Sequence, residues 1–164
     1  MDLLEPADVR DAFVNSSRSR AAAVTFPRPW PPERADERDF LAWADPKAPL
    51  RAYLVVGAPI CDEIVSIELR LGESAGPRRS SHCDWCHTQD AEGGSRLVVA
   101  PRAGARGRSG DSIGRYVCTD FDCSRRARRP LLGHQRSVSG APDLRVDELR
   151  ARVGTFVDRV RGAD

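Results

Sequence analysis

Four cysteines occur as two close pairs, and they constrain the fold of this chain more than any other feature. Cys83 and Cys86 form a C-x₂-C pair, and Cys118 and Cys123 form a C-x₄-C pair. Two thiolates separated by two to four residues supply two zinc ligands from one tight turn, so two such pairs complete a tetrahedral shell. Because a closed four-cysteine shell leaves no position for a substrate, we expect one structural zinc ion per chain.

Three other uses of the cysteines stay open in the sequence. They could be small buried apolar residues, or Cys83 and Cys86 could form a redox dithiol. The run from Cys83 to His87 also spells C-x-x-C-H, the attachment pattern of c-type haem, although haem leaves the second pair without a role. His82 and His87 flank the first pair and could replace a thiolate, but we expect them on the surface. Cys61 stands alone and is expected to be a core thiol.

Composition indicates a globular protein of a reducing compartment. The chain is 40% hydrophobic and 30% charged, which is typical of folded domains. It contains no run of 18 apolar residues, so we expect no membrane span. Its first residues lack the basic and apolar regions of a signal peptide, so we expect a cytoplasmic protein. In such a compartment clustered cysteines are more often metal ligands than disulfides.

The first part of the chain shows helical patterns interrupted by proline. Residues 6–23 are predicted to form a helix, with Pro6 suited to its first turn. Four prolines between 27 and 34 exclude a regular element there. A short helix is predicted over about 36–44. Residues 1–46 are therefore expected to form a small helical segment.

The middle of the chain predicts two β-hairpins. Residues 51–57 and 63–71 are rich in β-branched and aromatic side chains and are separated by a turn with glycine and proline. Residues 96–101 and 114–118 resemble a second hairpin, joined by the Gly-rich stretch 103–114, for which a mobile tip is the simplest interpretation.

The end of the chain predicts one long helix, over residues 143–161, with Asp143 as its N-cap. A short basic helix is expected from the last cysteine ligand to residue 129. A zinc knuckle, a hairpin and a ligand at a helix start make up the treble-clef arrangement. The expected fold class is α+β, in which residues 47–164 form a treble-clef zinc domain of antiparallel hairpins and a C-terminal helix.

Arginine gathers in the middle segment. Residues 78–136 carry twelve arginines against six acidic residues, and such a surface suits either ribosomal RNA phosphates or an acidic protein surface. The arginines expected to contact a partner are Arg106, Arg108, Arg125, Arg126, Arg128 and Arg129. Near the ligands, Tyr116 and Phe121 are expected to pack, and Trp85 is expected to be exposed in the knuckle.

Catalytic patterns are lacking. The chain contains no nucleophile elbow, and its Gly-rich stretch lacks the G-K-[ST] ending that cradles phosphates. We therefore expect no enzyme activity and no small-molecule substrate.

Three stretches carry a resemblance to a known family. FLAWADP at 40–46, RAYLV at 51–55 and GRYVCTDFDCS at 114–124 resemble short bacterial proteins with the "FBP" treble-clef zinc-finger domain. That family includes the fusidic-acid-resistance proteins, which bind elongation factor G and help it leave a drug-stalled ribosome. The resemblance implies that the four paired cysteines hold zinc and that the chain binds elongation factor G on the ribosome. The resistance proteins have a larger helical N-terminal domain than residues 1–46 can build.

Overall fold

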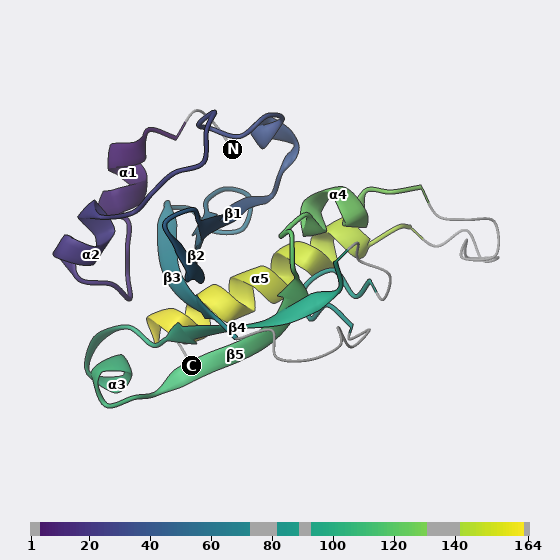
Figure 1. The fold of residues 1–164 in the computed structure, drawn as a ribbon. Coiled ribbons are helices and arrows are strands. Elements are labelled where there is room, and N and C mark those ends of the chain that lie inside the picture. The colour runs from purple at the N-terminus through teal and green to yellow at the C-terminus, as the bar shows by residue number, and fades with distance from the viewer. Residues whose placement is uncertain (1–3, 73–81, 89–92, 131–141, 163–164) are drawn as a thin grey trace.

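A five-stranded antiparallel sheet, with its strands in chain order, forms the centre of the protein (Figure 1). The computed structural model describes residues 4–72, 82–88, 93–130 and 142–162. The strands are β1 (Phe40–Asp45), β2 (Ala48–Val56), β3 (Val65–Leu71), β4 (Ser95–Pro101) and β5 (Ser112–Cys118). The two predicted hairpins correspond to β2–β3 and β4–β5 and are confirmed.

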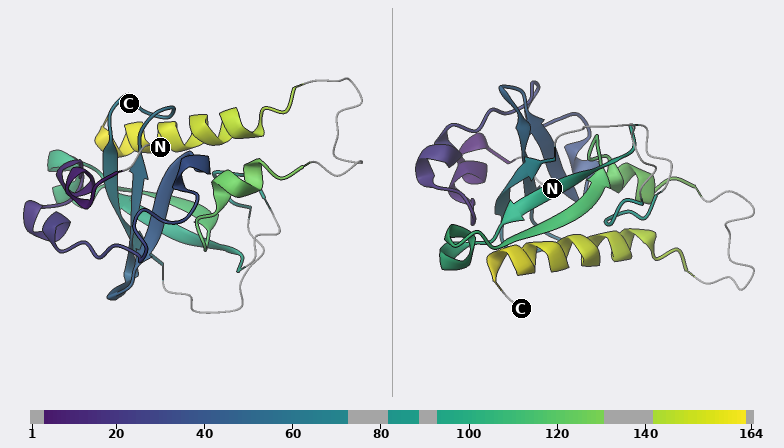
Figure 2. Two further views of the ribbon diagram at one scale, coloured as in Figure 1. Left: turned by 90° about the horizontal axis from the view of Figure 1, so that it is seen from above. Right: turned by 60° about the horizontal axis from the view of Figure 1, so that its bottom comes forward.

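Helices lie on both sides of this sheet. They are α1 (Pro6–Asp11), α2 (Arg18–Ala22), the 3₁₀ helix η1 (Ala35–Glu37), α3 (Gly104–Arg108), α4 (Cys123–Ala127) and α5 (Arg145–Arg161). Figure 2 shows α5 running along the sheet, with α4 near its first turns and α3 near its last. Among the described residues, no helix combines the length and the apolar character needed to cross a bilayer. The α+β fold class is confirmed.

Two apolar clusters cover opposite sides of β1 and β2. One face of α5 repeats apolar residues at helical spacing and packs into the larger cluster. The buried residues of that face are Leu149, Val153, Phe156, Val157 and Val160. The smaller cluster joins the N-terminal segment to the other side of the sheet through Val9, Trp43 and Tyr53. Since both sides are covered, residues 52–56 of β2 are all buried.

The N-terminal segment covers the free edge of β3. β3 pairs with β4 over only two residue pairs near its end, so its earlier residues need other partners. The backbone N–H of Val14 donates to the Ser66 carbonyl at 3.1 Å, and the Ser66 N–H donates to the Ala12 carbonyl at 2.9 Å. The segment after α1 therefore acts as a short extra strand beside β3.

Asn15 closes the gap where β3 and β4 separate. Its Nδ2 donates to the Glu68 carbonyl at 3.0 Å and to the Pro101 carbonyl at 2.9 Å. Its Oδ1 accepts the Glu68 N–H at 2.8 Å. One amide side chain thus joins the end of β4 to the middle of β3.

The structure corrects two of the predicted N-terminal elements. The helix predicted over 6–23 is two short helices, α1 and α2, because the residues between them pair with β3. The helix predicted over about 36–44 is η1 followed by the strand β1. A short apolar run such as 40–43 fits either period, and burial on both faces of the sheet favours the strand here.

Two further predictions also need correction. The long helix begins at Arg145, and its N-cap position is Leu144 rather than Asp143. The Asp143 carboxylate instead accepts the backbone N–H of Arg145 at 3.2 Å. The Gly-rich stretch 103–114 is no open tip, since it contains α3 and the first residues of β5.

Candidate metal centre

The four paired cysteines come together at one end of the sheet. Cys83 and Cys86 lie in the turn over residues 82–88, Cys118 is the last residue of β5, and Cys123 is the first residue of α4. Their Sγ atoms all lie within 4.8 Å of one another. The sequence prediction that these four residues form one cluster is therefore confirmed.

The spacing of the sulfurs suits a tetrahedral cation. The Sγ atoms of Cys83 and Cys123 are 3.6 Å apart, and those of Cys86 and Cys118 are 3.5 Å apart. Four thiolates at the usual zinc–sulfur distance lie about 3.8 Å from one another. A disulfide needs sulfurs at about 2.05 Å, and all four cysteines are free. The four cysteines are thus positioned to bind a metal ion, and the donor set fits zinc.

Backbone hydrogen bonds shape the first pair into a knuckle. The Cys86 N–H points to the Cys83 sulfur at 3.5 Å, and the His87 N–H donates to the Cys83 carbonyl at 2.8 Å. His87 takes a left-handed conformation with φ of 55°, which closes the tight turn. Asp84 then joins the knuckle to β5: its N–H donates to the Tyr116 carbonyl at 2.7 Å, and its carboxylate accepts the Tyr116 N–H at 2.8 Å.

Four crowded sulfurs cannot all carry negative charge without a cation beside them. Hydrogen bonds with Cys118 and Cys123 hold the pKa of the Cys83 thiol far below its usual range. Hydrogen bonds with Cys118 and Cys83, together with burial, raise the pKa of Cys123. A divalent cation bound among the sulfurs would resolve this conflict, because it stabilises all four thiolates.

Aromatic packing connects the knuckle to the core. Trp85, which was expected to be exposed, is buried against Phe40 and Phe156 at ring-centroid distances of 5.2 and 5.7 Å. Phe121 is buried as expected, whereas Tyr116 on the outer strand β5 is 49% exposed. The prediction was wrong for Trp85 because the knuckle sits on α5, which sequence spacing alone does not reveal.

The histidines beside the cysteines lie outside the cluster. His82 and His87 are exposed, and the Nδ1 of His82 lies 3.3 Å from the His87 carbonyl. Cys61 is partly buried and packs against the larger apolar cluster, and burial raises its pKa. Within the described ranges, the four paired cysteines are the one group of residues placed to hold a metal ion.

Two of the arginines expected to contact a partner form ion pairs within the chain in which one member of the pair is buried. Arg126 is buried and donates from both terminal nitrogens to the two carboxylate oxygens of Asp120 at 2.7 Å. Arg128 donates to both carboxylate oxygens of Asp39, which is buried and also accepts from Arg150 Nε at 2.8 Å. Sequence reasoning missed Asp39, because an acidic residue before a strand carries no signal of its burial.

The other four arginines are exposed. Arg106 Nε donates to the Asp111 carboxylate at 2.9 Å. Arg125 and Arg129 lie on the outside of α4 and just after it. Arg108 lies at the end of α3. The cluster expected from sequence is thus divided between the zinc end of the molecule and the α3 end.

Comparison with known proteins gives one match. A family model described as the FBP C-terminal treble-clef zinc-finger matches residues 8–160. No curated protein and no solved structure matches the chain. The matched region extends over the sheet, the four cysteines and nearly all of α5. It includes residues on both sides of the boundary that the sequence predicted near residue 46, between the N-terminal segment and the zinc domain. The chain belongs to the FBP C-terminal treble-clef zinc-finger family, and its four clustered cysteines make it a zinc-binding module.

Proposed function

We propose that this chain is a non-enzymatic, cytoplasmic zinc protein that binds elongation factor G and acts on translation at the ribosome. Membership of the family carries the proposal, since it includes fusidic-acid-resistance proteins that grip the factor through the zinc-bearing domain. The cysteine centre supports a role in binding, because a shell of four thiolates leaves no ligand position for a reacting molecule.

A charged pocket beside the zinc centre is the surface that we assign to the factor. It has a volume of about 340 Å³ and lies between η1 and α4. Its charged lining residues are Glu33, Arg34, Glu37, Arg38, Asp122, Arg125, Arg128 and Arg129. Arg125 is 68% exposed at the rim, and Arg129 is exposed beside it. Exposed guanidinium forks pair well with carboxylates, so this surface suits an acidic patch on a protein.

Zinc would hold this surface in place. Cys123 begins α4, so the metal shell fixes the helix that presents Arg125. The buried Asp39 accepts from Arg128 and from Arg150, which attaches the same helix to α5. A chain without metal would lose the first of these attachments, and its affinity for the factor would fall with it.

A titration with purified elongation factor G tests the proposal. The double variant Arg125→Gln/Arg129→Gln should bind the factor at least tenfold more weakly than the wild type, since each change removes a charged donor. Arg18→Gln is the matched control: Arg18 is an exposed arginine on α2, away from the zinc end. Absence of saturable binding by the wild-type, zinc-loaded protein would refute the proposal.

Ribosomal RNA is the second candidate partner, and the excess of arginine in residues 78–136 favours it. RNA affinity would fall steeply as salt rises, in proportion to the number of phosphates contacted. Titrations against the factor and against ribosomal RNA at 50 and at about 200 mM salt would separate the two partners.

A further inference from the structure

A second charged pocket lies at the opposite end of α5 from the cysteines. Near the start of α5, Arg145 donates to the Arg129 carbonyl at 2.7 Å, and near its end the Val160 carbonyl accepts the Ala103 N–H at 2.7 Å. The 17 residues of α5 separate these ends by about 25 Å. The second pocket has a volume of about 350 Å³ and is bounded by α2, β3 and α3.

Arginine dominates the lining of this second pocket. Arg20, Arg70, Arg102 and Arg108 line it, and no aspartate or glutamate does. Arg20 pairs with Glu68, and the Arg102 Nε lies 3.3 Å from the Asp111 carboxylate. The side chains of Arg70 and Arg108 form no ion pair or hydrogen bond with any described part of the chain. Two guanidinium groups therefore face this pocket without a counter-charge from the described residues.

The sheet adds a further positive charge beside the second pocket. Arg51 and Arg70 are directly opposite each other on β2 and β3, an arrangement of like charges that destabilises a sheet. The nearest carboxylate is Glu68, which already pairs with Arg20 and lies 3.4 Å from Arg51. It also accepts from the Ser16 hydroxyl at 2.6 Å. The carboxylate of Glu68 is thus shared among several donors, so the net charge of this group of side chains is positive.

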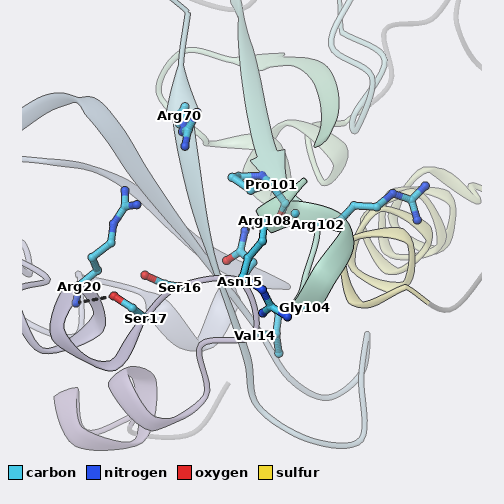
Figure 3. A pocket seen from close by; sticks show the side chains of 11 residues that line it. Val14, Asn15, Ser16, Ser17, Arg20, Arg70, Pro101, Arg102, Gly104 and Arg108 are labelled. Atoms are coloured by element: carbon cyan, nitrogen blue, oxygen red, sulfur yellow. Dashed lines mark hydrogen bonds between the residues drawn. The ribbon is translucent and has the colours of Figure 1, made fainter. Parts of the chain in front are cut away.

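Close backbone packing fixes the position of α3, which forms one side of the second pocket. A Cβ atom on Gly107 would lie 1.7 Å from the Arg102 carbonyl oxygen, so only glycine allows α3 to approach this closely. Gly104, with φ of +67°, makes the turn into α3. In Figure 3 the Arg102 side chain runs toward α5, whereas Arg108 lies beside Asn15 at the centre of the view. Arg108 therefore lies on a helix whose backbone has little freedom to move.

The pocket beside α4 makes an informative contrast. It too is lined by arginines, but three acidic residues line it with them. The pocket at α3 has no such balance, so a bound anion is the simplest counter-charge for Arg70 and Arg108.

We propose that the pocket at α3 binds a phosphoryl group. Guanidinium forks bind phosphate oxygens bidentately. They hold a doubly charged phosphate more strongly than they hold a singly charged carboxylate. Its volume falls within the range of small-ligand pockets, which leaves space for a phosphate with its attached sugar. A free nucleotide and the backbone of an RNA strand both present this group, so the chemistry is common to the two sources.

Calorimetric titration of the full-length, zinc-loaded protein tests this site with three probes: inorganic phosphate, adenosine monophosphate and a six-nucleotide single-stranded RNA. Arg70→Gln and Arg108→Gln should each weaken binding of the recognised probe about tenfold. Arg125→Gln, on α4, should leave it unchanged. Tighter binding of the monophosphate identifies a small ligand as the source. Tighter binding of the RNA, lost in the same two variants, identifies the RNA backbone.

Two results would overturn the site. One is that none of the probes binds at millimolar concentration. The other is that Arg125→Gln weakens binding as much as Arg70→Gln, which would indicate general attraction by a basic protein. Zinc content and melting temperature show whether each variant is folded. Retention of elongation factor G binding by Arg70→Gln and Arg108→Gln would separate this site from the proposed function, because the factor surface lies at the other end of α5.

Discussion

Cys61 and Cys118 show how position decides what a single thiol does. Cys61 is partly buried beside apolar side chains, and no other cysteine lies with it. Cys118 ends β5, where its sulfur faces that of Cys86 at 3.5 Å. A thiolate is expensive to bury alone, but four around one cation are stable. The same side chain is therefore a core residue at one position and is placed to bind a metal ion at the other.

Replacement of one ligand should remove both the metal and much of the stability. We expect Cys118→Ser to lose bound zinc and to be destabilised by several kcal/mol, since metal binding by such a site contributes on the order of 10 kcal/mol to folding. Cys61→Ser is the control and should keep its zinc. Elemental analysis and thermal unfolding measure both effects. One zinc retained per Cys118→Ser chain would contradict the assignment of Cys118 as a ligand.

At the scale of elements, Asp39 joins β1, α4 and α5. It precedes β1, its backbone N–H donates to the Ser124 hydroxyl at 3.0 Å, and its buried carboxylate accepts from Arg128 and Arg150. Burial acts to raise the pKa of Asp39, but the hydrogen bonds from these two arginines outweigh it and hold the pKa below its ordinary value. The ionised carboxylate is thus part of what attaches α4 to α5.

The change Asp39→Asn should cost about 2 kcal/mol or more at neutral pH, because it removes the charge that both arginines share. A carboxyl whose folded pKa is depressed stabilises the fold fully above its unfolded pKa of about 3.9, and this contribution disappears as pH falls through the folded pKa. The difference between wild type and variant should therefore be constant above about pH 5 and shrink below about pH 4. Urea unfolding across this range measures it, and a difference that grows on acidification would contradict this account.

Two glycines should respond to alanine in opposite directions. At Gly107 an added methyl meets the Arg102 carbonyl at 1.7 Å, so α3 must shift and we expect a loss of about 1–3 kcal/mol. At Gly154, inside α5, the nearest atom lies at an ordinary 3.7 Å, on Ile60. Alanine there should stabilise the protein by about 0.5–1 kcal/mol. Melting temperatures of the two variants test this, and equal shifts would be inconsistent with it.

At the scale of the whole molecule, the sheet has a weak point where β3 and β4 separate. Only two residue pairs join these strands. The gap between them divides the sheet into one half with β1, β2 and β3 and another half with β4 and β5, which carries the metal-binding cysteine of β5. Asn15 and α5 connect the halves: Asn15 bonds to both β3 and β4, and α5 packs into the larger cluster, which draws on both. The metal centre is therefore positioned by residues remote from it in sequence.

Removal of the Asn15 side chain should loosen this connection. Asn15→Ala leaves three backbone groups of Glu68 and Pro101 without their partner, so we expect a loss of about 2–4 kcal/mol. Hydrogen exchange of the Glu68 amide should accelerate in step with that loss. Ser112→Ala, at an exposed strand end, should change neither. Unaltered exchange at Glu68 would show that other contacts carry the connection.

The sequence alone determined which four cysteines come together and which local elements have the clearest periodicity. Two cysteine pairs at zinc spacing predict the cluster, and alternation predicts β2–β3 and β4–β5, because ligand geometry and strand period are local properties. The 3.6-residue period predicted α5 for the same reason. Its exact start was missed, since Asp143 accepts the backbone N–H of Arg145 from outside the helix.

Tertiary structure alone decided which side chains are free to act. The apolar run 40–43 fits helix and strand alike, and β1 forms because both sides of it are covered. Arg126 and Arg129 look equivalent in sequence, yet one is buried against Asp120 and the other is exposed. Burial and pairing arise from contacts between segments far apart in the chain, and no local pattern encodes them.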